Sequence, residues 1–297
     1  MRNKTELEKA YAFCQNLAKS HYENFPVASI LLPQKLRRPI AAIYAFARTA
    51  DDFADEDTIA AEERLRQLNG YSQHISDIAE HKYQGNDPIF LALADTVIRF
   101  NLPIQLLEDL LIAFRQDVVK SRYATFNEVL DYCRFSANPV GRLLLHLEGN
   151  PSQQQLQQSD AICTALQLIN FYQDLEQDFT EQNRVYIPED ELAAIGIDAA
   201  SLIQTDTSKL APVLRSLYLR TEKIITEGIE LGSTIPGRLG WEIRAMTLAG
   251  ITTLSALKQQ SNHAMLNRPR LTRKTMIAVI LNSALNSRYR KTIYKLL

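Results

Sequence analysis

Two rows of oxygen-bearing side chains stand at helical spacing in this 297-residue chain. Asp51 and Asp55 end the run Arg48-Thr-Ala-Asp-Asp-Phe-Ala-Asp, and residues four apart on a helix share one face at about 5–6 Å. Such a carboxylate pair can bind one divalent cation. The run also fits a solvated acidic helix end, but carboxylates are unfavourable late in a helix because its dipole is negative there. Asp51 and Asp55 are therefore candidate metal ligands.

The second row consists of Asn170, Asp174 and Asp178, again four residues apart. The run before it, AICTALQLINFY, is apolar, so we expect Asn170 to be partly buried and its amide to need partners. A satisfied helix–helix contact is the alternative. Hard oxygen ligands on two facing helices suit Mg²⁺, which usually also binds substrate phosphate oxygens. The implied substrate is a diphosphate.

Three- and four-residue spacing of apolar side chains covers most of the chain, and no strand is expected. The predicted helices span residues 4–20, 39–54, 60–81, 88–100, 103–119, 125–148, 152–179, 210–232, 236–260 and 271–296. Pro39 fits the first turn of its helix. Residues 180–208 are polar and broken by Pro188 and Gly196, which predicts a loop with a short helix. The fold class is all-helical.

Composition favours one globular domain over residues 1–297, since 46 % of the residues are hydrophobic and the net charge is −1. Such a charge does not indicate a nucleic-acid partner. The three cysteines form no CxxC pair, and no stretch approaches about 20 apolar residues, so we expect a cytoplasmic protein.

The end of the chain is basic. After Glu242 there is no Asp or Glu, while ten Lys or Arg residues follow, which predicts a basic C-terminal helix at about 271–297. These cations could rest on anionic lipid head groups, giving peripheral contact with the inner membrane. Equally, the helix could be a solvated surface whose apolar side packs on the core.

Further landmarks appear in a fixed order along the chain. They are His21-Tyr-Glu-Asn-Phe25, Tyr44-Ala-Phe-Ala-Arg48, Tyr132-Cys-Arg-Phe-Ser-Ala-Asn138-Pro-Val-Gly141 and Arg184-Val-Tyr186-Ile-Pro188. Together with the two acidic rows they resemble the squalene/phytoene synthase family over roughly residues 15–260. The resemblance implies a single-domain isoprenoid-synthase helical bundle with a central cavity. It also implies two or three Mg²⁺ ions bound by Asp51, Asp55, Asn170, Asp174 and Asp178.

The resemblance assigns roles to other side chains as well. Arg48, Arg184, Tyr186, His21 and Gln167 are expected to contact the diphosphate, while Phe25, Tyr44 and Tyr132 are expected to line the isoprenoid cavity. The guanidinium of Arg48 suits phosphate, because its fork matches two oxygens. His21 could instead satisfy a neighbouring carbonyl. Arg244, on a late helix that borders the cavity in relatives, is a further candidate.

Two segments resemble the hydroxysqualene synthases of bacterial hopanoid pathways, namely Glu23-Asn-Phe-Pro-Val-Ala-Ser29 and Ser136-Ala-Asn-Pro-Val-Gly-Arg142. The expected reaction is Mg²⁺-assisted ionisation of presqualene diphosphate, stabilisation of the carbocation by aromatic rings, and capture by water. No GxGxxG follows a strand, so NADPH is not expected. Asn138 is a candidate for holding the water, and Pro139 for opening the helix beside it. A kink needed only for packing is the alternative.

Other functions fit parts of the pattern. A condensing transferase would take farnesyl diphosphate to presqualene diphosphate, squalene, dehydrosqualene or phytoene. A non-catalytic assembly factor with this fold would tend to lose the aspartates, which are all present here. A head-to-tail chain-elongating enzyme would want two DDxxD motifs, against which the Asn170 row argues.

Overall fold

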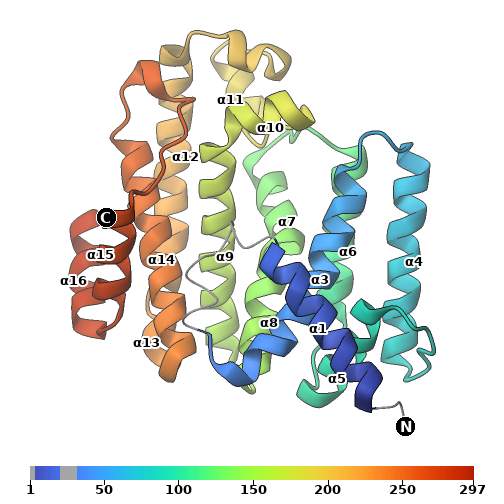
Figure 1. The fold of residues 1–297 in the computed structure, drawn as a ribbon. Coiled ribbons are helices and arrows are strands. Elements are labelled where there is room, and N and C mark those ends of the chain that lie inside the picture. The colour runs from blue at the N-terminus through green and yellow to red at the C-terminus, as the bar shows by residue number, and fades with distance from the viewer. Residues whose placement is uncertain (1–3, 21–31) are drawn as a thin grey trace. The chain divides into compact units, whose positions relative to one another are not determined.

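The computed structural model describes residues 4–20 and 32–297. Within these ranges every regular element is a helix, so the predicted all-helical fold is confirmed (Figure 1). None of the helices in the same ranges is long and apolar enough to cross a membrane. The chain divides into two compact units, residues 1–119 with 139–156, and residues 120–138 with 157–297. The expectation of a single domain over residues 1–297 stays a prediction.

The first unit is built around α3 (Gln34–Asp55), which contacts four other helices. These are α1 (Lys4–Ser20), α4 (Ala61–Ala79), α5 (Pro88–Phe100) and α6 (Gln105–Val119), while α8 (Asn138–Glu148) completes the unit from its second residue on. Phe46 of α3 is fully buried against Tyr71 and Phe90, with ring centroids 5.6 and 6.1 Å away. Offset and edge-on aromatic contacts of this kind stabilise a core beyond the area that they bury. They fix the helix that carries Asp51 and Asp55.

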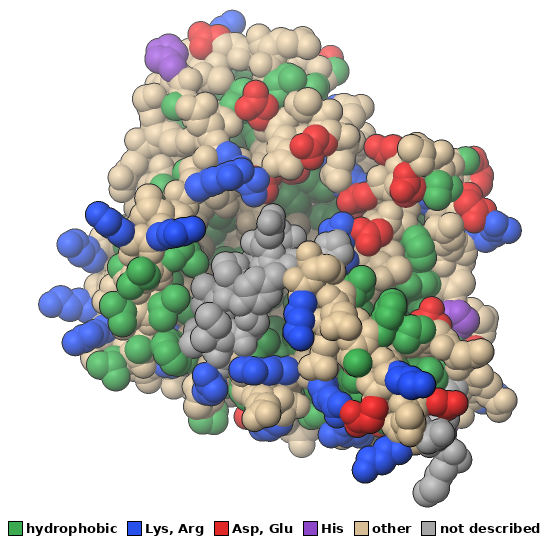
Figure 2. All heavy atoms as spheres, in the orientation of Figure 1, with side chains coloured by type: hydrophobic (Ala, Val, Ile, Leu, Met, Phe, Trp, Pro, Cys, Tyr) green, Lys and Arg blue, Asp and Glu red, His purple; other side chains and the backbone are tan. Residues whose placement is uncertain are grey.

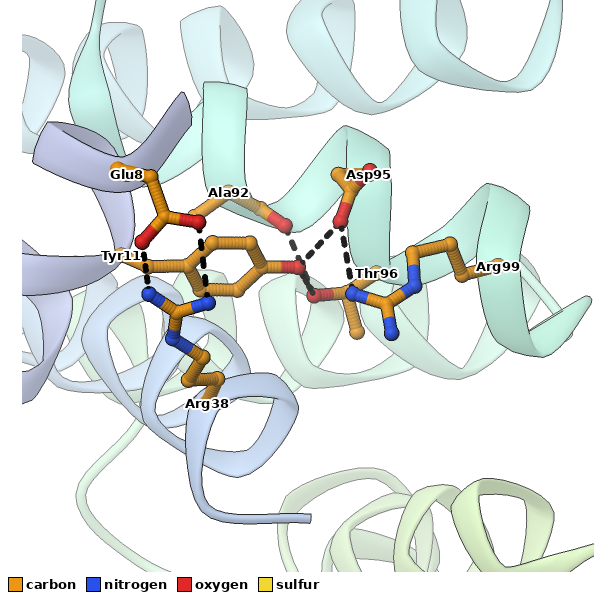
Figure 3. Close-up of polar contacts among 7 residues, drawn as sticks. All are labelled: Glu8, Tyr11, Arg38, Ala92, Asp95, Thr96 and Arg99. Atoms are coloured by element: carbon orange, nitrogen blue, oxygen red, sulfur yellow. Dashed lines mark hydrogen bonds and ion pairs between the residues drawn. The ribbon is translucent and has the colours of Figure 1, made fainter. Parts of the chain in front are cut away.

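Polar contacts hold α1 against α3 and α5 (Figure 3). Tyr11 is 1 % exposed, and its hydroxyl donates to Asp95 Oδ2 at 2.7 Å. Glu8 and Arg38 form an ion pair between α1 and α3. Burial raises the pKa of Tyr11 above its ordinary value, so the hydroxyl stays a neutral donor. α1 is thereby tied both to the start of α3 and to α5.

The second unit contains the remaining helices. They are α7 (Phe126–Ser136), α9 (Gln153–Gln173, within this unit from Gln157), α10 (Leu175–Gln182), α11 (Glu189–Ala194), α12 (Thr207–Gly228), α13 (Leu231–Thr234), α14 (Gly237–Lys258), α15 (Arg273–Ser283) and α16 (Asn286–Leu296), with 3₁₀ helices η2 (Ala199–Gln204) and η3 (Asn262–Ala264). In Figure 1, α9, α12 and α14 run side by side. The predicted loop over residues 180–208 accordingly contains α11 and η2.

Two glycines let α12 and α14 approach α9 closely. A Cβ atom at Gly228 would lie 2.6 Å from the carbonyl oxygen of Gln158, and one at Gly250 would lie 2.3 Å from Leu166 Cδ2. The contact at Gly228 is the stricter one, because a backbone carbonyl cannot rotate away as a side chain can. Any larger residue there would push α12 off α9.

The helix predicted over residues 39–54 begins earlier, at Gln34, so the placement of Pro39 in a first turn is wrong. Pro33 is the residue before the helix, and Pro39 lies inside it. An internal proline removes one backbone hydrogen bond. Contacts made by the residues before Pro39 offset that loss, since Leu36 is fully buried and Arg38 pairs with Glu8.

Four other long helices predicted from the sequence, over residues 125–148, 152–179, 210–232 and 271–296, are each interrupted once. Residues 125–148 form α7 and α8 with a break at Ala137, and Pro139 lies in the first turn of α8, where its missing N–H is tolerated. The expected opening of the helix beside Pro139 is therefore present. Residues 152–179 form α9 and α10 with a break at Asp174, where φ is −102° and ψ is 11°.

The predicted basic C-terminal helix is also wrong as a single element. It is the pair α15 and α16, separated at Ala284 and Leu285, and Leu285 has extended backbone with φ −116° and ψ 129°. The carbonyl oxygens of Ser283 and Ala284 accept hydrogen bonds from the Arg244 guanidinium. These bonds satisfy the end of α15, because the last carbonyls of a helix have no partner within the helix itself.

Candidate active site

The acidic row of the first unit lies in the last two turns of α3. Asp51 and Asp55 are half-buried, while Asp52 between them is exposed. Arg48 Nη1 lies 3.2 Å from Asp51 Oδ2, and Arg48 Nη2 lies 2.5 Å from Asp52 Oδ1. The prediction that Arg48 and Asp51 share one helical face is confirmed by this contact. Arg48 is thus held as a counter-charge beside the row.

A second arginine stabilises the acidic end of α3. Arg64 of α4 donates to the carbonyl oxygen of Ala54 at 2.8 Å and lies 3.4 Å from Asp57 Oδ1. A cation at a helix C-terminus offsets the negative end of the dipole. The carboxylates therefore have local compensation for an otherwise unfavourable position. Tyr44 is half-buried on the same helix, and burial raises its pKa while Arg48 opposes that shift.

The acidic row of the second unit continues through the break between α9 and α10. The backbone amide of Asp174 donates to the carbonyl oxygen of Asn170 at 2.9 Å, and the backbone amide of Asp178 donates to the carbonyl oxygen of Asp174 at 2.7 Å. The helical bonding pattern therefore continues, and the three side chains stand on successive turns. Asn170 is exposed, which corrects the prediction that it is partly buried. Its neighbours Ile169 and Phe171 occupy the buried face of α9 and turn Asn170 outward. Asp174 and Asp178 are half-buried.

Arg268 holds this row, and sequence reasoning missed it. Its Nε lies 2.5 Å from Asp174 Oδ1, its Nη2 lies 3.1 Å from Asp174 Oδ2, and its Nη1 donates to Gln177 Oε1 at 3.1 Å. Gln173 fastens the adjoining segment by donating to the carbonyl oxygen of Pro269 at 2.7 Å. In the sequence Arg268 is one of ten Lys or Arg residues after Glu242, and nothing there distinguishes it from the others.

Burial disfavours the ionised form of the two carboxylates of this row. Burial raises the pKa of Asp178 to about 7 and the charge of Asp174 adds to that shift, although Arg184 and Arg268 oppose it. Burial also raises the pKa of Asp174, and it outweighs Arg268 and Arg270. A bound cation would relieve both the burial penalty and the repulsion. The row therefore fits a divalent ion.

Among the described residues, no three His, Cys, Asp or Glu side chains gather into a complete set of metal ligands. Mg²⁺ does not require one, because it usually keeps several waters and takes one or two carboxylates together with substrate phosphate oxygens. Carboxylates and an amide oxygen are hard ligands of the type it prefers. The donor set of each row is compatible with Mg²⁺ bound together with a phosphorylated substrate.

An aromatic cluster adjoins the row on the inner side of α9. Tyr186 stacks on Phe171 with ring centroids 3.6 Å apart and planes at 6°, and Tyr132 lies 5.6 Å from Tyr186. Tyr123 completes the cluster at 5.4 Å from Tyr186. The structure thus brings together Tyr132 and Tyr186, which the sequence marked, with Tyr123 and Phe171, which it did not. Phe171 directly follows Asn170, but its role depends on the fold.

Backbone pairing sets the position of the segment that carries Arg184 and Tyr186. The backbone amide of Val185 donates to the carbonyl oxygen of Ser121 at 3.0 Å, and that of Glu189 donates to the carbonyl oxygen of Tyr123 at 2.9 Å. Arg184 is half-buried, and its Nη1 donates to Gln182 Oε1 at 2.8 Å. Gln167 is half-buried on α9. The candidates His21 and Phe25 lie outside the described residues.

Asn138 is buried, and its Oδ1 accepts a hydrogen bond from Thr164 Oγ1 at 2.9 Å. A role in holding water would therefore fall to its Nδ2. Arg244, a candidate through the resemblance, is buried and donates to the carbonyl oxygens of Gly232, Ser283 and Ala284. Through these bonds Arg244 connects the end of α15 to α13.

Comparison with known proteins agrees with these features. The squalene/phytoene synthase family model matches residues 18–275. The chain is 37 % identical over 240 residues to a hydroxysqualene synthase of Sinorhizobium fredii, covering 80 % of each protein. It is 38 % identical over 226 residues to a hydroxysqualene synthase of Rhodopseudomonas palustris, covering 74 % of each.

A solved structure supports the same conclusion. The crystal structure of a squalene synthase from Alicyclobacillus acidocaldarius superposes with a TM-score of 0.80 at 32 % identity, and the match covers 90 % of this chain and 98 % of that one. The helical fold, the two acidic rows and the family match lead to one assignment. The chain belongs to the squalene/phytoene synthase family.

Proposed function

We propose that this enzyme is a hydroxysqualene synthase, which converts presqualene diphosphate and water to hydroxysqualene and diphosphate. The observation that carries the proposal is the 37–38 % identity to hydroxysqualene synthases over about three quarters of the chain or more. Membership of the family implies a prenyl diphosphate substrate, and the family is generally Mg²⁺-dependent.

In this proposal the metal ligands are the two acidic rows, Asp51 and Asp55 on α3, and Asn170, Asp174 and Asp178 on α9 and α10. When bound, Mg²⁺ supplies positive charge to the departing diphosphate. The guanidinium groups of Arg48, Arg184 and Arg268 bind phosphate oxygens, for which their fork geometry is suited. His21, Gln167 and Tyr186 add contacts to the same diphosphate. Arg48 and Arg268 already pair with carboxylates of the rows, so both guanidinium groups are in place before the substrate binds.

The reaction breaks the bond between the substrate carbon and the diphosphate oxygen, and the electron pair leaves with diphosphate. The carbocation rearranges beside aromatic faces, for which Tyr44, Tyr132 and Phe25 are the candidates. Asn138 Nδ2 holds the water whose oxygen bonds to the cation, and that water then loses a proton. Hydroxide has replaced diphosphate at the end, so the reaction consumes no reductant and NADPH is not required.

A second candidate function is head-to-head condensation of farnesyl diphosphate. The 32 % identity to a squalene synthase over most of the chain favours condensation over chain elongation or a non-catalytic role. The two candidate functions differ in substrate, because condensation consumes two prenyl diphosphates and hydration consumes one molecule of presqualene diphosphate.

We also propose that the enzyme works in the cytoplasm, with peripheral contact to the inner membrane. Cys14 and Cys133 are buried thiols outside any disulfide, which fits a reducing compartment. The apolar substrate expected here has to be taken from a lipid phase.

Product analysis tests the proposal. Purified enzyme is incubated with Mg²⁺ and no NADPH, with presqualene diphosphate in one arm and farnesyl diphosphate in the other, and organic products are identified by mass spectrometry. Hydroxysqualene from presqualene diphosphate is the expected result. Presqualene diphosphate or dehydrosqualene formed from farnesyl diphosphate, with presqualene diphosphate left unhydrated, would instead establish the condensing function.

A further inference from the structure

Large hydrophobic side chains are exposed at one end of the chain. Among the described residues nine large hydrophobic side chains are exposed, and four of them fall within the last 21 residues. These are Ile277, Leu281, Leu285 and Tyr294, with exposures of 57, 59, 54 and 65 %. The other five are scattered over separate helices. Clustered exposed apolar side chains mark an interaction surface, whereas scattered ones need no explanation.

The cluster lies on the outward side of α15 and α16. On α15 the buried residues are Val279 and Ser283, and Leu281 stands opposite them, one turn from Ile277. On α16 the buried residues are Tyr289 and Ile293. Helical geometry places the exposed Lys291 and Tyr294 away from that pair. Each helix therefore buries one side and presents the other to solvent.

Contacts beneath the two helices hold them as a fixed platform. Trp241 of α14 donates from its indole nitrogen to Ser283 Oγ at 3.0 Å, and Tyr289 donates to the carbonyl oxygen of Ile229 at 2.9 Å. Arg244 closes the junction between α15 and α16 through its bonds to Ser283 and Ala284. The apolar side chains are thus exposed on an ordered surface rather than at a frayed end.

Cations surround the apolar cluster. The exposed cations of the two helices include Arg273, Lys274, Arg288, Lys291 and Arg290, and the sequence has no Asp or Glu after Glu242. Figure 2 shows hydrophobic side chains flanked by Lys and Arg where α15 and α16 lie in Figure 1. A second copy of the chain on this surface would bring like charges together, which disfavours self-association.

We propose that α15 and α16 form a docking surface for an anionic lipid bilayer, named here the α15–α16 surface. Ile277, Leu281 and Leu285 enter the interface, Tyr294 lies at head-group level, and the surrounding cations contact lipid phosphates. Lys and Arg suit this position because their stems pack on apolar groups while their charges reach the head groups. This inference rests on the proposed function, which requires an apolar substrate drawn from a membrane, and it names the surface that makes the contact.

The α15–α16 surface is close in the chain to the second acidic row. Arg268, which holds Asp174, precedes the start of α15 at Arg273 by a short segment, and Gln173 of α9 binds that segment at Pro269. A bilayer docked on α15 would therefore lie next to the segment that positions a diphosphate-binding arginine. The docked bilayer and the diphosphate-binding arginine would then lie close together on the second unit.

Vesicle sedimentation of the full chain tests the proposal. Wild type is expected to sediment with vesicles of phosphatidylcholine and phosphatidylglycerol at low salt, and much less with phosphatidylcholine alone, because added salt or loss of anionic lipid removes the electrostatic part. The double variant Ile277→Ser/Leu281→Ser and the charge variant Lys274→Glu/Lys291→Glu are each expected to weaken binding at least about tenfold. The matched control is Ile98→Ser/Leu219→Ser, which removes exposed side chains of the same type elsewhere.

The outcomes separate this inference from its rivals. Equal binding by wild type and both surface variants would overturn it, as would no binding of wild type to anionic vesicles. Sedimentation velocity showing a dimer that Ile277→Ser/Leu281→Ser abolishes, without vesicle binding, would assign the surface to a second copy instead. Turnover of presqualene diphosphate in detergent micelles is expected to be the same for wild type and Ile277→Ser/Leu281→Ser. Failure of the proposed function would show as no product from either protein, whatever the vesicles report.

Discussion

Arg268 and Asp174 stand 94 residues apart in the chain and meet through a two-point ion pair. The pair places a guanidinium fork at the break between α9 and α10, where burial raises the pKa of both carboxylates of the row. A fixed cation beside half-buried carboxylates can serve a metal-bound diphosphate in two ways. It neutralises one ligand before substrate binds, and it is positioned to contact phosphate oxygens afterwards.

Arg268→Ala is expected to lower kcat/KM for presqualene diphosphate by about 10- to 100-fold, because a charge-assisted contact to the diphosphate is lost. In a double-mutant cycle with Asp174→Asn, the combined loss should be smaller than the product of the single losses, since the two side chains act together. Arg66→Ala is the matched control, because Arg66 also pairs with a carboxylate, Glu63, at an exposed site. Independent, multiplicative losses would show that the ion pair has no part in catalysis.

Asp51→Asn is expected to raise the Mg²⁺ concentration needed for half-maximal rate by about tenfold or more, since a neutral amide is a weaker ligand for a hard cation. EDTA should abolish turnover by wild type, and excess Mg²⁺ should restore it. Asp57→Asn serves as the control, because Asp57 is an exposed carboxylate just beyond the same helix. An unchanged Mg²⁺ dependence in Asp51→Asn would remove α3 from the metal site.

Asn138→Ala is expected to lower the share of hydroxysqualene among the products in favour of hydrocarbons, because the water that captures the cation is no longer held. Thr164→Val removes the hydrogen bond to Asn138 Oδ1 while leaving Nδ2 in place, so it separates positioning of Asn138 from its contact with water. A smaller change of the same kind is expected there. Unchanged product ratio and rate in Asn138→Ala would leave the residue a purely structural role in the kink beside Pro139.

Glu242 predicts a pH dependence of stability. Its side chain is 4 % exposed, burial raises its pKa to about 8, and within the described residues its Oε2 has no hydrogen-bond partner. The unfolded chain loses this proton near its ordinary pKa of 4.5, whereas the folded protein keeps it up to about 8. This group therefore lowers stability progressively as pH rises through that window. A difference of 1 between the folded and unfolded pKa values corresponds to about 1.4 kcal/mol.

Glu242→Gln removes that titration, so its free energy of unfolding relative to wild type should rise between pH 5 and pH 8, by an amount on the order of a few kcal/mol. Urea unfolding at several pH values measures the difference. Glu230→Gln, at an exposed ion pair, should show a much smaller change over the same range. A difference between Glu242→Gln and wild type that stays constant with pH would contradict a buried neutral carboxyl at this position.

Gly228→Ala is expected to destabilise the protein by about 1–3 kcal/mol, because the new methyl group would overlap the backbone of α9 at Gln158. Thermal or urea unfolding measures the loss. Gly70→Ala provides the comparison, since a Cβ there meets no atom within 4 Å and alanine favours the helix. Equal stability of Gly228→Ala and wild type would mean that α12 moves away from α9 without penalty.

Elements with local signals at both ends were predictable from the sequence. The helix predicted over residues 88–100 has the bounds of α5, because Asp87 accepts from the amide of Ile89, Pro88 takes the first position, and Asn101 ends the helix with φ 48°. Both acidic rows were likewise visible, since a spacing of four residues is a local property. Exposure of Asn170 was not, because it depends on which face of α9 the rest of the unit covers.

Features that depend on distant residues could not be predicted from the chain. The end of α15 is fixed by Arg244, which lies 39 residues before Ser283. The ion pair of Arg268 and the stacking of Tyr186 on Phe171 likewise depend on tertiary contacts. Helical periodicity continues across the breaks between α9 and α10 and between α15 and α16, so a prediction from the pattern joins helices that the fold separates.

Labelling of the product oxygen tests the central claim most directly. Turnover of presqualene diphosphate with Mg²⁺ in ¹⁸O-water, without NADPH, is predicted to give hydroxysqualene that carries one ¹⁸O atom, because the carbon–oxygen bond to diphosphate breaks and solvent water forms the new one. An alcohol without label would mean that the phosphorus–oxygen bond was cleaved instead. That result would contradict ionisation of the substrate and capture of its cation by water.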